Sequence, residues 1–142
     1  MTGRDLLEEI KRSRQHLLIL RDELREQRAT LEGIRAVVYD GIHGACGGIP
    51  KDVADGIAAI EKKKLEICSE WADLVDKRLK AQRIISAIPR QDYKDILTER
   101  YTNGKRWVDI AAVMRYDASW LFRLHTRALR EFDKIYAREN SP

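Results

Sequence analysis

The residues of this chain that could support chemistry are mainly basic, and they gather towards its C-terminal end. Lys105 and Arg106 precede an expected helix, where they could meet a phosphate together with the free backbone amides of its first turn. A second expected helix carries cations along residues 123–138. Cations placed along a helix are typical of contact with nucleic-acid phosphates. The cations of this second helix are Arg123, Arg127, Arg130, Lys134 and Arg138.

Catalytic and cofactor-binding arrangements do not stand out in the sequence. Cys46 and Cys68 are too few and too unpatterned for a disulfide framework or a zinc site, and His16 and His43 are isolated. The glycine-rich stretch 41–48 lacks the Gly-Lys-Ser/Thr ending and the preceding strand of a phosphate-binding loop. We therefore expect a protein that is not an enzyme, with no catalytic residues, no metal site and no cofactor.

The composition favours helices and places the excess positive charge late in the chain. Charged residues make up 35% of the sequence, against about 25% in an average globular protein, and there are only three prolines. Residues 1–88 hold 16 Lys/Arg and 15 Asp/Glu, whereas residues 89–142 hold 11 and 8, a balance of +3. No signal-like segment and no run of about 18 apolar residues occurs. We expect a soluble protein of a reducing cytoplasm, with no membrane partner.

Two long helices are expected before residue 89. Apolar residues recur every three or four positions along residues 4–38 and again from Val53 to Ile88, a repeat typical of helices that pack along a seam. The glycine-rich segment Tyr39–Lys51 separates them. An antiparallel helical hairpin is the simplest interpretation, and a longer intermolecular coiled coil is the alternative. The seams are Leu6, Ile10, Leu17, Leu20, Leu24, Leu31, Ile34 and Val38, and Val53, Ile57, Ile60, Ile67, Trp71, Leu74, Ala81, Ile85 and Ile88.

The same region predicts an oligomer. Polar residues interrupt the two seams, and polar seam positions are a common way to fix the register of a coiled coil. Leu7, Leu18 and Val75 are expected beside the seam, where a hairpin alone would leave them uncovered. We therefore expect at least a homodimer built through residues 4–88. The interruptions are Ser13, Gln27, Lys64 and Arg78.

Three shorter helices are expected after Pro89, which disfavours helix in the residue before it. They cover Asp92–Tyr101, Trp107–Met114 and a last helix for which Asp117 is a good N-cap. Their lengths and the short turns between them match the plan of a helix-turn-helix. The expected fold is therefore all-α, with residues 1–88 as a coiled-coil hairpin and residues 89–142 as a DNA-binding domain.

The segment LTERYTNGKRWVDIA at residues 97–111, followed by RLHTRAL at residues 123–129, resembles region 4 of bacterial sigma factors. It resembles more closely the phage-encoded regulators of the ArpU/RinA type. The resemblance implies a phage or prophage transcriptional regulator that binds promoter DNA in a bacterial host cell and controls late or packaging genes. The matching residues are Arg100, Tyr101, Gly104, Trp107, Ile110, Ala111, Arg123, Leu124, His125, Ala128 and Leu129.

Two features depart from the pattern of these regulators. Arg115 occupies the turn position that usually holds glycine, which points to a left-handed backbone there. At the start of the last helix only Ser119 and Arg123 are conventional readers of base edges, while Trp120 and Phe122 could contact thymine methyl groups or a protein. The expected DNA-contacting residues are Lys105, Arg106, Ala118, Ser119, Trp120, Phe122, Arg123, His125, Thr126, Arg127 and Arg130.

Within this set we expect Arg123 near base edges and Lys105, Arg106 and Arg127 on phosphates. For His125 a phosphate contact and a packed structural role are equally compatible with the sequence. The expected partners are double-stranded DNA, host RNA polymerase and further copies of the chain. Two alternatives remain: a small terminase-type accessory of DNA packaging, and an adaptor that binds a protein through a sigma-like fold.

Overall fold

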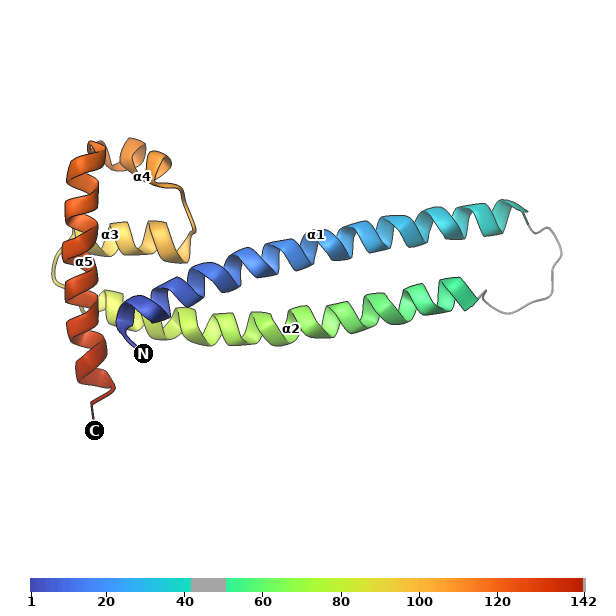
Figure 1. The fold of residues 1–142 in the computed structure, drawn as a ribbon, viewed down its shortest axis with the longest axis horizontal. Helices are drawn as coiled ribbons and strands as arrows, with labels where there is room; N and C mark the ends of the chain where they lie inside the picture. The colour runs from blue at the N-terminus through green and yellow to red at the C-terminus, as the bar shows by residue number, and fades with distance from the viewer. Residues whose placement is uncertain (42–50, 142) are drawn as a thin grey trace. The chain divides into compact units, whose positions relative to one another are not determined.

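In the computed structural model the described residues, 1–41 and 51–141, form helices and no strands (Figure 1), as the sequence predicts for an all-α protein. Helices account for 88% of them. No described helix is both long and apolar enough to span a membrane. Most of the glycine-rich stretch, 42–50, and the side chain of Val38 lie outside the described residues. The elements are α1 (Gly3–Gly41), α2 (Lys51–Ser86), α3 (Gln91–Leu97), the π-helical turn η1 (Thr98–Thr102), α4 (Trp107–Met114) and α5 (Ala118–Glu139).

The chain divides into two compact units, and this division differs from the predicted boundary at residue 88. Unit 1 combines residues 1–14 with residues 73–142, and unit 2 consists of residues 15–72. Helices α1 and α2 therefore contribute to both units. The first turns of α1 and the last turns of α2 belong with α3–α5 because they share one apolar core with them. A sequence pattern reports that a helix has a buried face, but not which helices cover it.

Unit 2 contains parts of α1 and α2 that run antiparallel. The Lys63 ammonium lies 2.9 Å from the Glu23 carboxylate, and His16 Nε2 lies 3.2 Å from the Glu70 carboxylate. In these pairs the residue number increases along α1 while it decreases along α2. The two helices therefore run antiparallel. Apolar contact supplies the core of this unit. Its members are Leu31, Val53 and Ile60, with Leu24 and Ile57 partly buried against them.

Two residues of the predicted seams are more exposed than expected, and one residue beside the seams is more buried than expected. Trp71 and Ile34, predicted to face inward, are 51% and 39% exposed, because a pair of helices buries only a narrow stripe of each. Leu7, predicted beside the seam, is completely buried. It belongs to unit 1, where the start of α1 is covered by more than one helix.

The start of α1 is capped and docked on α5 within unit 1. Thr2 and Asp5 form a reciprocal capping box: Asp5 N–H donates to Thr2 Oγ1 at 3.2 Å, and Thr2 N–H donates to Asp5 Oδ2 at 2.8 Å. Hydrogen bonds from the backbone N–H and the side chain of Thr2 lower the pKa of the Asp5 carboxyl. Arg4 N–H then donates to Asp133 Oδ1 of α5 at 3.1 Å. Gly3 allows this approach, because a Cβ there would lie 2.7 Å from both Asp133 Oδ1 and the Phe132 ring.

The core of unit 1 forms along one face of α5. Helix α3 meets this face with Tyr93, Ile96 and Leu97, and α4 contributes Ile110. Ile135, predicted to point inward, is only half-buried, and Tyr136 is buried in its place. The buried residues of α5 are Leu121, Leu124, Ala128, Leu129, Phe132 and Tyr136.

The turn between α4 and α5 has the left-handed residue that the sequence predicts. Arg115 has φ 58° and ψ 39°, and its N–H donates to the Ala111 carbonyl. Tyr116 N–H donates to the same carbonyl at 3.2 Å, so the end of α4 is satisfied. Asp117 is the predicted N-cap of α5, and its carboxylate accepts a hydrogen bond from Trp120 N–H at 2.8 Å. The three-residue turn therefore fixes where α5 begins.

Two glycines of α1 provide a matched test of the docking of α1 on α5. We expect Gly3→Ala to lower the free energy of unfolding by about 1–3 kcal/mol, because the new methyl group overpacks against the Phe132 ring. Gly33 has open space around it, so Gly33→Ala should raise the free energy of unfolding by about 0.5–1 kcal/mol through helix propensity. Urea unfolding followed by circular dichroism measures both. A Gly3→Ala variant as stable as the parent would contradict this docking.

Candidate nucleic-acid interface

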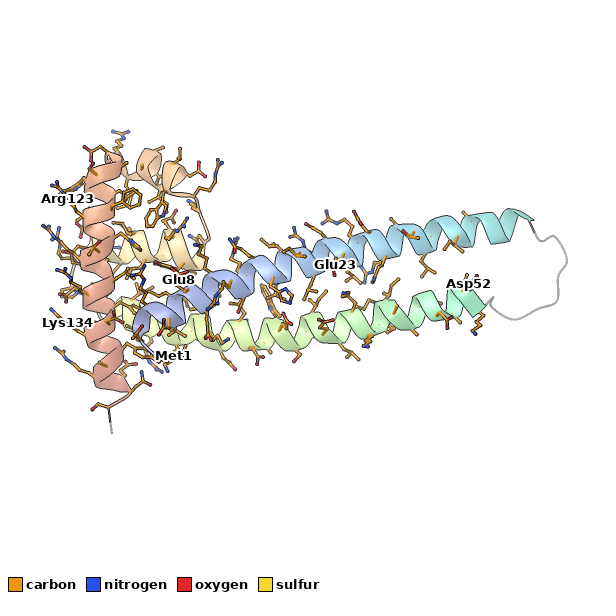
Figure 2. All side chains as sticks on the ribbon, in the orientation of Figure 1. Met1, Glu8, Glu23, Asp52, Arg123 and Lys134 are labelled. Carbon is orange, nitrogen blue, oxygen red and sulfur yellow. The ribbon has the colours of Figure 1, made fainter. Side chains whose placement is uncertain are left out.

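The cations of α5 share one face of the helix. Their spacings of four, three, four and four residues keep them within an arc of about 80° at 3.6 residues per turn. This arc lies opposite the buried face that packs in the core of unit 1. Figure 2 shows the labelled Arg123 and Lys134 on the same side of α5. We call this set the basic stripe: Arg123, Arg127, Arg130, Lys134 and Arg138.

The N-terminal part of the basic stripe is not neutralised. Among the described residues, Arg123, Arg127 and Arg130 have no ion pair with a carboxylate, and α5 carries no acidic residue before position 131. The acidic residues of α5 are engaged elsewhere. Asp133 accepts the Arg4 N–H, and Glu139 pairs with Arg83 at 3.4 Å. Lys134 is different, because it pairs with Glu131 at 3.1 Å.

The other two predicted phosphate ligands are paired with acidic residues. The Lys105 ammonium forms an ion pair with Glu99, and this contact lowers the pKa of Glu99. Arg106 Nε donates to Asp109 Oδ2 at 3.2 Å. A phosphate would have to compete with these carboxylates. Both cations are thus weaker candidates for DNA contact than the three arginines at the start of the stripe.

His125 lies in an aromatic cluster on the inner side of α5. Its Nε2 shares a hydrogen bond of 2.8 Å with the hydroxyl of Tyr101, and its ring meets the Trp107 ring edge to face with centroids 4.5 Å apart. Phe122 contacts the same indole at 5.4 Å. Burial, with the nearby cations Arg4, Arg100 and Lys11, lowers the pKa of His125 to about 4. His125 is therefore neutral at pH 7, and its geometry supports the packed structural role. We define the aromatic cluster as Tyr101, Trp107, Phe122 and His125.

Arg100 ties the loop before α4 to this cluster. Its guanidinium lies 4.6 Å from the centroid of the Trp107 ring, and its Nη1 donates to the Lys105 carbonyl at 3.0 Å. Asn103 N–H donates to the Thr98 carbonyl at 2.9 Å, which closes the wide π-helical turn. Gly104 follows with φ 66°, a conformation that suits glycine. The RY-G-W part of the motif therefore positions α4 and α5 rather than offering groups to a ligand.

The remaining predicted contact residues lie at the exposed start of α5. Ala118 and Ser119 are exposed, and Trp120 and Phe122 are 37% and 49% exposed. The hydroxyl of Thr126 donates to the Phe122 carbonyl one turn earlier at 3.0 Å, so its proton is already used. The exposed aromatic surface thus adjoins the N-terminal end of the basic stripe.

The structure brings together three metal-type donors that the sequence did not predict. His16, Glu66 and Glu70 of unit 2 bring one ligand atom each within 4.8 Å of one another. Glu66 and Glu70 are four residues apart on α2, and that spacing was the only signal in the sequence. His16 comes from α1 and already pairs with Glu70. No hydrogen bond to the second ring nitrogen of His16 orients it among the described residues, as metal-binding histidines usually require.

The neutral state of His125 predicts how stability depends on pH. Between its folded pKa of about 4 and its ordinary value of 6.5, the unfolded chain binds a proton at this site and the folded chain does not. The free energy of unfolding should therefore fall as the pH is lowered from 6.5 towards 4. Carboxylates with lowered pKa values, such as Glu99, add to this decrease in the free energy of unfolding only below about pH 5.

Urea unfolding at a series of pH values measures this dependence. His125→Gln should flatten the profile between about pH 6.5 and 5, because the titrating group is removed. Lys62→Ala, an exposed position of α2 in unit 2, leaves the aromatic cluster and every histidine intact and should keep the profile of the parent. Identical profiles for the parent and His125→Gln would show that the ring is not held in its neutral form.

No protein-family model matches this chain, and no curated protein or solved structure is significantly similar to it. The resemblance to the ArpU/RinA-type regulators and to sigma region 4 therefore remains a prediction from the motif residues alone.

Proposed function

We propose that this chain binds double-stranded DNA through α5, with α4 and α5 acting as a helix-turn-helix. One observation carries the proposal: three unneutralised arginines stand on the exposed face of a helix whose opposite face is buried in the core of unit 1. Cations that lack acidic partners attract a polyanion at little cost, because no existing ion pair must be broken. The three are Arg123, Arg127 and Arg130.

The shape of this surface also suits a DNA groove. The major groove is about 12 Å wide and admits a helix of about 10–12 Å diameter. Ala118 and Ser119 are small and exposed at the start of α5, so the N-terminal half of the helix can approach base edges closely. Arg123 is the residue that we propose near those edges. Lys105 and Arg106 would add phosphate contacts only if they exchanged Glu99 and Asp109 for DNA.

The biological role that we propose is transcriptional control of phage or prophage genes in the cytoplasm of a bacterial host. It rests on the resemblance of residues 97–111 and 123–129 to the ArpU/RinA-type regulators and to sigma region 4. The late or packaging genes of the phage are the proposed targets, and host RNA polymerase is a proposed partner. Genome-wide recovery of DNA bound to the chain in its host would report the site and the neighbouring gene together.

A second candidate function is that of a protein-binding adaptor. Val108 and Val113 of α4 are 75% and 65% exposed, and Phe122 also reaches the surface. Exposed apolar side chains of this size favour contact with a protein when they adjoin one another. Phe122 packs against Trp107 and is itself 49% exposed, so it offers a protein partner an apolar contact beside the basic stripe.

Substitutions in the basic stripe test the DNA-binding proposal. Arg123→Ala and Arg130→Ala should each weaken binding to a duplex. Each should also reduce the slope of log affinity against log salt by about one, because each removes one positive charge that displaces counterions from the DNA. Arg123→Ala should in addition narrow the difference between a preferred site and random DNA, by roughly 1–3 kcal/mol. Fluorescence anisotropy at several salt concentrations measures both effects.

The control is Lys62→Ala, which removes an exposed cation of α2 in unit 2. This variant should bind DNA with the affinity and the salt slope of the parent. If the two arginine variants also bind like the parent, the basic stripe does not contact DNA and the adaptor function becomes the better proposal.

We also propose that the chain is at least a dimer through residues 4–88, with Trp71 rather than Leu7 as the apolar residue to be covered. Trp71 is half exposed on α2, whereas Leu7 is already buried. Light scattering at micromolar concentration should give a mass of at least twice 16.5 kDa, and Trp71→Lys should shift it towards the monomer. A strictly monomeric parent would exclude this assembly.

A further inference from the structure

We propose that Arg127, held against the indole of Trp120, reads guanine, so that the preferred DNA site carries a guanine beneath the N-terminal half of α5. This inference rests on the proposed DNA-binding function and deepens it. It also changes the expected role of Arg127, which the sequence assigns to a phosphate. The observations behind it are the position of the guanidinium, its cation–π contact with Trp120 and the absence of a carboxylate partner among the described residues.

The contact between these two residues follows from their spacing. Trp120 and Arg127 are seven residues apart, which is close to two turns, so they lie on the same side of α5. Long side chains in a helix lean towards its N-terminus, and the Arg127 guanidinium accordingly lies 5.7 Å from the centroid of the indole. The charge of Arg127 is thereby carried back towards the end of α5 that we propose to enter the groove.

Trp120 itself is fixed by the start of the helix. Its backbone N–H donates to the Asp117 carboxylate at 2.8 Å, so the first turn of α5 is capped at this residue. Its side chain is 37% exposed, which leaves part of the indole covered and part available to the guanidinium. The contact with Arg127 therefore starts from a residue whose backbone is fixed by the cap of α5.

Stacking leaves the donors of Arg127 free for a ligand. A cation–π contact does not use the N–H donors of the guanidinium, and no described carboxylate pairs with them. Guanine offers O6 and N7 in the major groove, two acceptors that fit this planar fork, and arginine on guanine is the commonest base-specific contact. Because the stack already restricts the side chain, less conformational entropy is lost when the contact forms.

Arg123 and Arg130 do not share this arrangement. No aromatic ring among the described residues contacts either guanidinium, so neither is held in one orientation before binding. For Arg130 such a mobile cation suits a phosphate, which accepts hydrogen bonds from many directions and carries no sequence information. Arg130 is therefore a matched control for Arg127: it belongs to the same stripe and carries the same charge, but it has no stacking partner.

The experiment uses the full chain and begins with selection of its preferred duplex from random DNA. The selected duplex should contain at least one invariant guanine. Replacing that guanine by 7-deazaguanine removes the N7 acceptor and leaves base pairing and phosphates unchanged. We expect the affinity of the parent to fall about tenfold, the loss of part of a good bidentate contact.

The variants then assign the effect to a residue. Arg127→Lys keeps the charge but loses the planar fork, so it should bind the normal and the 7-deazaguanine duplex equally while its salt slope stays that of the parent. Arg130→Lys should remain about tenfold sensitive to 7-deazaguanine. Trp120→Leu should bind the normal duplex more weakly and lose most of the sensitivity, because the guanidinium is no longer held.

The remaining outcomes would overturn either the guanine contact, the role of Arg127 or DNA binding itself. A preferred site without guanine, or equal sensitivity of the parent and Arg127→Lys to 7-deazaguanine, would overturn the guanine assignment alone. An Arg127→Ala variant that loses one unit of salt slope with unchanged sequence preference would place Arg127 on a phosphate. A parent chain that binds no duplex would instead overturn the proposed function. Circular dichroism of each variant checks that α5 remains folded.

Discussion

The rest of unit 1 depends on the burial of one face of α5, and the aromatic cluster is where that burial is most specific. The Tyr101 hydroxyl and His125 Nε2 share a part-buried hydrogen bond, and Trp107 packs its indole against the same imidazole. Burial, together with the nearby charges of Arg4 and Arg100, lowers the pKa of His125 and keeps its ring neutral. A hydrogen bond in partly buried surroundings is costly to leave unmade, so these partners fix the rotation of α5 about its own axis more tightly than apolar contacts alone.

This rotation determines which side chains α5 turns to solvent. Like charges three or four residues apart on a helix destabilise it by about 0.2–0.5 kcal/mol per pair, and Arg123, Arg127 and Arg130 are arranged in this way with no ion pair to a carboxylate among the described residues. The buried face supplies enough packing to tolerate that repulsion. Carboxylates do occur on α5, but Asp133 and Glu139 serve contacts with α1 and α2 in unit 1. A polyanion would relieve the remaining repulsion, which is why the stripe is informative about function.

Short-range sequence patterns predicted much of this structure. They were wrong where the environment of a residue depends on residues far away in the chain. Helix periods, the Asp117 cap and the left-handed Arg115 follow from short stretches of sequence, and each is present. The hydrogen bond between Tyr101 and His125 joins residues 24 positions apart, and no spacing in the sequence predicts it. The predicted burial of Trp71 was wrong for a related reason. An apolar period shows that one face can be buried, whereas the number of neighbouring helices decides how wide that face is.

The two halves of α5 have different supports, and the difference bears on recognition. Towards the C-terminus, Asp133 accepts the Arg4 N–H and Phe132 lies against Gly3, so the start of α1 holds this half. Towards the N-terminus, the aromatic cluster and the Asp117 cap hold the other half. A helix fixed at both ends loses little conformational entropy when it binds, and its side chains keep their spacing in the groove. Loosening α1 at Gly3 should therefore weaken recognition by the stripe, although that glycine touches no part of the proposed DNA-binding face.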